Sequence, residues 1–129
     1  MPYQIVMRGG PSNGSGFTCF TFVGGVGPDG GGPNDGGLAC AYTTVGTNGT
    51  GPGVNPAILC RLALQYHESV EDVVGVVENN SIYYGCNLVA ADHSGVAAVI
   101  ERTYSNINVR WSFDHEPMYV DGESVLAAP

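Results

Sequence analysis

Four cysteines are the strongest nucleophiles in this chain, and their spacing limits the chemistry that they can do. Cys19, Cys40, Cys60 and Cys86 are separated by 21, 20 and 26 residues. Without a CxxC pair, a zinc knuckle and a thioredoxin motif are excluded. Each cysteine lies in an apolar stretch, where a free thiol behaves as a small hydrophobic side chain. We therefore predict buried free thiols. Cys19, flanked by Thr18 and Phe20, is the most plausible lone nucleophile, although packing is the more ordinary role for it.

The other reactive residue types do not form a recognisable site. His67, His93 and His115 share no HExxH pair and no close metal-ligand spacing, so we expect surface histidines and no metal site. Residues 25–30 match GxGxxG, but glycines and Pro33 follow where a dinucleotide site needs a helix N-terminus. No Ser-His-Asp triad is predicted from the sequence. These residues therefore predict neither a metal nor a cofactor.

Composition limits the class of protein and its partners. The chain has 129 residues, a net charge of −8, and four Arg with no Lys. Such a charge repels phosphate backbones and anionic lipid surfaces, so we expect no nucleic-acid or membrane partner. No apolar run approaches the ~18 residues of a membrane span, and no signal peptide is visible, which predicts a cytoplasmic protein. Leu, Ile, Val and Phe total 31 residues, enough for a packed core in a single domain covering residues 1–129.

Helix start signals and a change of hydrophobic period predict the order of the elements. Asn55 before Pro56, and Ser69 three residues before Asp72, are typical N-terminal caps of two consecutive helices. Alternating or β-rich stretches predict strands on both sides of these helices. The strands are expected at 3–7, 17–23, 38–45, 86–91, 96–102, 107–111 and 118–120. Strands, two helices and strands again indicate an α+β fold, with the helices on one face of an antiparallel sheet.

Three sequence blocks, in this order, resemble a known family of enzymes. The blocks are GGPNDGGLA at 31–39, GVNPAILCRLAL at 53–64 followed by SVEDVV at 69–74, and GCNLVAADHSGVAAVIE at 85–101. They resemble the cysteine N-terminal-nucleophile (Ntn) hydrolases of the isopenicillin N acyltransferase group, with the choloylglycine hydrolases as more distant relatives. The resemblance covers residues 17–111, and the third block is its most specific part.

The resemblance implies a fold and a reaction. The family has a four-layer αββα sandwich, and its nucleophile is a Cys released by autocatalytic cleavage. The α-amine of that Cys acts as general base, and an acyl-enzyme forms from an amide or thioester carbonyl. The implied function is hydrolysis of a linear amide C–N bond, or acyl transfer. Its substrates would be small molecules such as acyl-amino acids, β-lactam side chains or β-alanyl amines. No cofactor is implied, and coenzyme A enters only for acyl transfer.

The resemblance assigns roles to four positions. Asn34 matches the Asn of an Asn-acid-x-Gly-Leu turn that, in the choloylglycine relatives, lines the active site, so it is the candidate substrate-binding residue. The ordinary interpretation is a tight turn, because Asn and Gly tolerate positive φ. Asp92, Glu101 and Asn87 match the third block, and we interpret them as structural residues.

Two features of the family pattern are missing from the sequence. The family nucleophile lies several dozen residues before the Asn turn, whereas Cys19 precedes Asn34 by only fifteen. The Thr-Asn-His stretch of the family would follow Pro129. We therefore expect the central part of a longer Ntn-hydrolase domain, truncated at both ends. Its nucleophile would lie outside this chain, its partner would be the rest of its own domain, and the isolated chain would be inactive.

Two alternatives remain open at this point. In the first, a short enzyme uses Cys19 after removal of residues 1–18. In the second, the chain is a non-catalytic α+β domain that acts through a partner.

Overall fold

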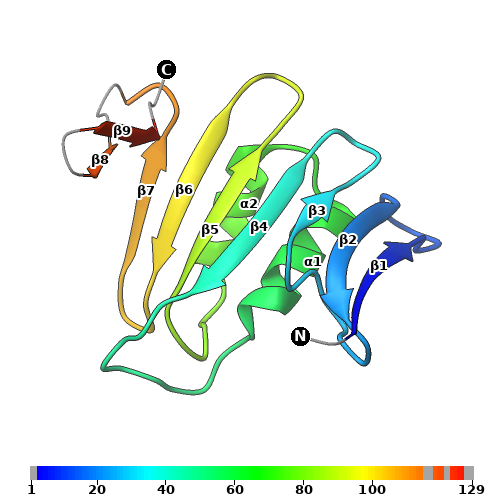
Figure 1. Ribbon diagram of the computed structural model, residues 1–129, viewed down its shortest axis with the longest axis horizontal. Helices are drawn as coiled ribbons and strands as arrows, with labels where there is room; N and C mark the ends of the chain where they lie inside the picture. The colour runs from blue at the N-terminus through cyan, green and yellow to red at the C-terminus, as the bar shows by residue number, and fades with distance from the viewer. Residues whose placement is uncertain (1–2, 115–117, 121–122, 127–129) are drawn as a thin grey trace.

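Antiparallel strands and two helices build the fold, as the sequence predicts. The computed structural model describes residues 3–114, 118–120 and 123–126. Figure 1 shows the elements in space. Their bounds are β1 (Gln4–Gly9), β2 (Phe17–Phe22), β3 (Gly32–Pro33), β4 (Ala39–Thr44), α1 (Pro56–Tyr66), α2 (Val70–Glu78), β5 (Cys86–Ala91), β6 (Ala97–Arg102), β7 (Ile107–Trp111), β8 (Met118–Val120) and β9 (Glu123–Leu126).

Five strands form the central sheet, in the order β3-β4-β5-β6-β7, with every neighbouring pair antiparallel. The β1–β2 hairpin lies beside it as a second sheet. Backbone hydrogen bonds join the two sheets: the Phe20 amide donates to the Gly31 carbonyl at 3.1 Å, and Phe17 forms a bridge with Asn34. A further two-stranded sheet pairs β8 with β9.

Both helices begin where their caps predict. The Asn55 side chain accepts a hydrogen bond from the Ala57 amide at 2.9 Å, and Pro56 opens α1. The Ser69 hydroxyl accepts from the Asp72 amide at 3.2 Å, and α2 begins at the next residue. These bonds satisfy backbone N–H groups that no helical carbonyl can reach. The predicted caps are therefore confirmed.

The helices cover one face of the central sheet and create the core. α1 packs on β4, and α2 packs on β5 and β6 (Figure 1). Leu59, Leu64 and Val73 on the helices, and Leu88 and Ile100 on the strands, have no exposed surface. Burying side chains of this size contributes about 1.5–3 kcal/mol each, which makes this interface the main source of stability.

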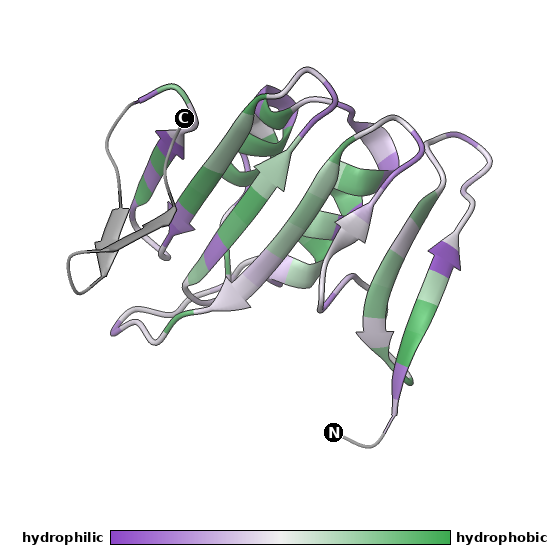
Figure 2. Cartoon of the chain, turned by 45° about the horizontal axis from the view of Figure 1, so that its top comes forward, coloured by the Kyte–Doolittle hydropathy of each residue, from purple (hydrophilic) through white to green (hydrophobic). Residues whose placement is uncertain are grey.

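We call the opposite side of the central sheet the open face, because no described helix covers it. Its residues alternate with the core residues along each strand. Ala41 pairs with Val89, and Val89 pairs with Val99, so an apolar row crosses three strands. Val89 is 46% exposed. Figure 2 shows hydrophobic colour along much of β5 and β6. The open-face residues of the five strands are Pro33, Ala39, Ala41, Thr43, Asn87, Val89, Ala91, Ala97, Val99, Glu101, Asn108 and Arg110.

Asp92 connects the β5–β6 hairpin to the start of α2. One carboxylate oxygen accepts from the Val70 amide at 2.9 Å, and the other accepts from the Ser94 amide at 2.9 Å. Hydrogen bonding by Ser94, and then by the backbone amides, lowers the pKa of Asp92. The structural interpretation of Asp92 therefore agrees with its contacts.

The lowered pKa of Asp92 predicts how stability depends on pH. Because the folded pKa is below the unfolded one, the contribution of Asp92 is present above its ordinary pKa and disappears as the pH falls through the lowered value. We expect Asp92→Ala to lower the free energy of unfolding by about 1 kcal/mol at neutral pH, because the amides of Val70 and Ser94 lose their acceptor. The difference in the free energy of unfolding between Asp92→Ala and the wild type should become smaller at acidic pH, where Asp92 is protonated in the folded wild type as well. Urea unfolding at several pH values measures it, with exposed Glu78→Gln on α2 as the control. An equal deficit at every pH would contradict the assignment.

Candidate functional site around Asn34 and at the rim of the open face

Asn34 lies between β3 and the turn before β4, and its side chain is bonded within the chain. The amide nitrogen donates to the carbonyl oxygens of Leu64 at 2.9 Å and His67 at 2.7 Å. The amide oxygen accepts from the Leu38 amide at 2.8 Å. Leu64 and His67 belong to the last turn and the C-terminal cap of α1. Asn34 therefore ties the C-terminus of α1 to the turn that leads into β4.

These bonds restrict any substrate contact by Asn34. A side-chain amide has two N–H donors and an oxygen with two lone pairs. Both donors and one lone pair of Asn34 are already used, and the residue is only 8% exposed. To donate a hydrogen bond to a substrate, Asn34 would have to release a carbonyl of α1. The geometry supports a structural role, and substrate binding by Asn34 stays a prediction.

Cys19 lies on β2 with its side chain in the core. It is 1% exposed, and a Cβ built on Gly32 would be 2.8 Å from its Cα. Burial raises the pKa of the Cys19 thiol, and the Arg61 guanidinium opposes this only in part. The reactive form of cysteine is the thiolate, which a raised pKa makes scarce at neutral pH. These properties suit packing better than nucleophilic attack.

The other three cysteines are buried as well. Cys40, Cys60 and Cys86 expose 2% of their surface or less, and all four thiols are free. The prediction of buried free thiols is confirmed.

Polar residues gather at one end of the open face. Glu101 on β6 pairs in register with Asn108 on β7 and Asn87 on β5. Arg110 Nη2 donates to Glu101 Oε1 at 2.7 Å, and Asn108 Nδ2 donates to Glu101 Oε2 at 3.0 Å. Both carboxylate oxygens are thus occupied. Glu101 therefore links two strands, in agreement with its structural interpretation.

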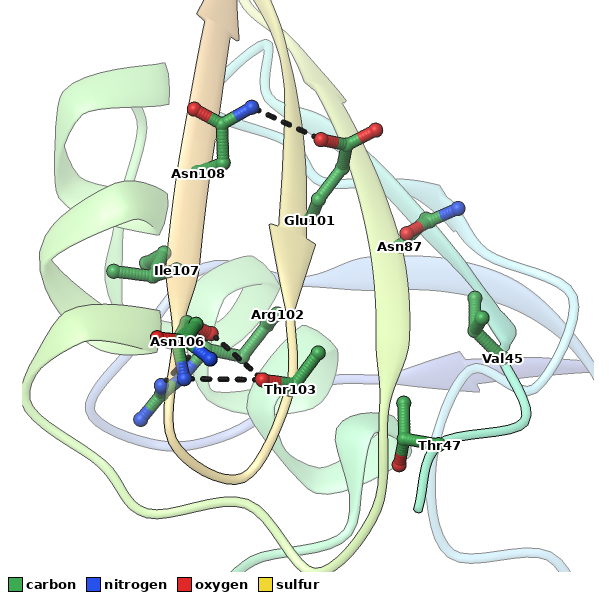
Figure 3. Close-up of a pocket in the computed structure, with 9 residues that line it drawn as sticks. All are labelled: Val45, Thr47, Asn87, Glu101, Arg102, Thr103, Asn106, Ile107 and Asn108. Carbon is green, nitrogen blue, oxygen red and sulfur yellow. Dashed lines mark hydrogen bonds between the residues drawn. The ribbon is translucent and has the colours of Figure 1, made fainter. Parts of the chain in front are cut away.

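A cavity of about 330 Å³ lies at this polar end, which we call the rim (Figure 3). Figure 3 shows Asn87, Glu101 and Asn108 on three neighbouring strands, with Thr103 and Asn106 in the loop beyond them. The sequence analysis did not find this cavity, because only strand register brings its walls together. The lining residues are Val45, Thr47, Asn87, Glu101, Arg102, Thr103, Asn106, Ile107 and Asn108.

The described histidines do not form a metal site. His67 lies at the end of α1, with Nδ1 3.8 Å from Asp72 Oδ2. His93 is exposed in the β5–β6 hairpin, and His115 lies outside the described residues. Within the described ranges, no group of three His, Cys, Asp or Glu residues could hold a metal ion. No helix in these same ranges is long and apolar enough to cross a membrane.

Comparison with known proteins identifies the family. The family model described as acyl-coenzyme A:6-aminopenicillanic acid acyl-transferase matches residues 3–116. The chain belongs to this family. A search of curated proteins found no match.

A solved structure supports the fold that the family implies. Penicillin V acylase from Agrobacterium tumefaciens superposes with a TM-score of 0.56 at 20% sequence identity. The alignment covers 86% of this chain and 39% of the acylase chain. The predicted α+β fold of the Ntn-hydrolase type is confirmed, and the chain spans well under half of the acylase.

Proposed function

We propose that this chain is the central part of an Ntn-type amide hydrolase or acyltransferase that reacts through a Cys acyl-enzyme. The nucleophile would come from polypeptide outside these 129 residues. The observation that carries the proposal is the open face: the helices of the described residues cover only one side of the sheet, and the other side presents an apolar row. The αββα arrangement places a second sheet on such a face. The family match and the 39% coverage of the acylase chain agree with this.

The residues of this chain would act mainly as a scaffold. The two helices pack on one face of the sheet, and Asn34 ties the end of α1 to the turn that leads into β4. A second sheet packed on the apolar row would leave the polar rim at the edge of the interface. The pair Glu101–Arg110 suits that place, because burying an ion pair completely costs more free energy than leaving it partly solvated.

The substrate class follows from the family and remains part of the proposal. We propose small molecules with an acyl group on nitrogen, such as acyl-amino acids, β-lactam side chains or β-alanyl amines. Attack by a Cys thiolate on the amide carbon would expel the amine and leave a thioester, which water or a second amine then cleaves.

Flanking sequence and activity together test the proposal. We expect the purified 129-residue chain to show no hydrolysis of an N-acyl amino acid above the buffer rate. We expect the reading frame to continue upstream to a Cys and downstream to a Thr-Asn-His stretch. The extended protein should hydrolyse the amide, and Cys19→Ala should leave that activity unchanged, because Cys19 is a packing residue.

Other outcomes favour the alternatives. Turnover by the 129-residue chain, lost in Cys19→Ala and accompanied by loss of residues 1–18 in the mass spectrum, would overturn the proposal in favour of a short enzyme. Stop codons on both sides, with no activity, would favour a non-catalytic domain that acts through a partner.

A further inference from the structure

Two of the buried cysteines are in direct contact. Cys40 Sγ on β4 and Cys60 Sγ on α1 are 3.3 Å apart, at the interface between the sheet and the first helix. Packing alone does not require this contact, because a thiol next to any apolar side chain fills the same space. A disulfide bond is about 2.05 Å long. The two sulfur atoms are therefore about one ångström from bonding distance, without any other group between them.

We propose that Cys40 and Cys60 are an oxidation site whose product is an intrachain disulfide between β4 and α1. The oxidant is a peroxide. The thiolate of one cysteine attacks hydrogen peroxide, forms a sulfenic acid and releases hydroxide. The thiol of the other cysteine then displaces the sulfenic oxygen as water, forming the S–S bond. Overall, two thiols and one peroxide give one disulfide and two waters.

The location of the pair determines which product forms and how fast. Both cysteines are buried, at 2% exposure or less, and the hydrogen bond with Cys40, together with burial, raises the pKa of the Cys60 thiol. The first step is therefore slow and depends on transient opening of the structure. The second step is fast, because the partner thiol is already in contact and no second peroxide has to enter. Disulfide formation should thus be faster than further oxidation of the sulfenic acid to sulfinic acid.

The other two cysteines provide internal comparisons. Cys19 lies on β2 and is buried to the same degree, but it has no thiol contact in the structure. Cys86 lies on β5 and influences the pKa of Cys60, yet only Cys40 is hydrogen-bonded to it. The geometry thus selects one pairing out of the six that four cysteines allow.

Peroxide treatment of the folded chain tests the proposal. After treatment and alkylation, the number of free thiols should fall from four to two. Peptide mapping should find residues 40 and 60 in one cross-linked peptide pair, with Cys19 and Cys86 alkylated. The cross-link closes a 20-residue separation, so the oxidised chain should unfold at a higher temperature by several degrees.

Variants separate the specific pair from general oxidation. Cys60→Ala should abolish the cross-link, whereas Cys19→Ala should leave it unchanged. Peroxide treatment of the wild-type chain reports the outcome even if a variant fails to fold. Sulfinic acid at Cys40 or Cys60, a cross-link that includes Cys86, or faster oxidation of Cys19 would overturn the proposal. None of these results depends on the amide chemistry proposed above.

Discussion

Asn34→Ala is expected to lower the free energy of unfolding by about 3 kcal/mol, because each buried polar group left without a partner costs about 1–3 kcal/mol. The substitution removes three hydrogen bonds at once. The carbonyls of Leu64 and His67 lose their donor, and the Leu38 amide loses its acceptor. Leu38 and Leu64 are fully buried, so water replaces these bonds poorly. Urea unfolding followed by circular dichroism measures the loss.

Two further variants show that the bonds, rather than the loss of volume, cause the effect. Asn34→Asp keeps the acceptor for the Leu38 amide but places a carboxylate oxygen against two carbonyl oxygens. We expect it to be at least as destabilised as Asn34→Ala at neutral pH. Asn48→Ala in the exposed loop after β4 should change stability by less than about 0.5 kcal/mol. If Asn34→Ala and Asn48→Ala change the free energy of unfolding equally, the three hydrogen bonds of Asn34 do not stabilise the fold as assigned here.

Local signals in the sequence predict the helices and most strands well. Asn55 with Pro56, and Ser69 with Asp72, act within one helical turn, so their spacing contains all the information that the cap requires. Six of the fourteen predicted strand ends differ from the observed ones by one or two residues, because fraying and pairing set them, and the other eight are identical. β3 and β9 were not among the predicted strands. β3 is a Gly-Pro pair that forms a strand only because β4 and β2 lie on either side of it.

The side-chain contacts at the candidate sites were harder to predict, because they join residues that are far apart in the sequence. The side chain of Asn34 bonds to residues 30 and 33 positions away, and no spacing rule encodes that. The motif singled out Asn34 as a substrate-binding candidate, which stays a prediction, whereas its hydrogen-bond partners followed only from the packing of α1. The contact between Cys40 and Cys60 depends in the same way on how a helix lies on a strand 20 residues earlier. Glu101 with Arg110 could have been paired from the sequence only if the β6–β7 register had been known.

Val89→Lys is expected to leave the stability of the isolated chain almost unchanged and to destabilise the extended protein strongly. Val89 lies in the middle of the apolar row on the open face and is 46% exposed. In the 129-residue chain a lysine there reaches water, so stability should change by less than about 0.5 kcal/mol. In a protein whose second sheet covers this face, the same lysine is a buried charge without a partner. Such a charge costs several kcal/mol, and about 3–5 kcal/mol is typical when a buried pair is broken.

Comparison of the two contexts therefore tests the open face directly. We expect Val89→Lys to unfold at the wild-type urea concentration in the isolated chain, and to fail to fold or lose activity in the extended protein. Thr50→Lys, in an exposed loop, should be neutral in both contexts. A neutral Val89→Lys in the active extended protein would mean that no layer packs on this face. The sandwich arrangement, and with it the scaffold role proposed for this chain, would then have to be abandoned even if the enzyme were active.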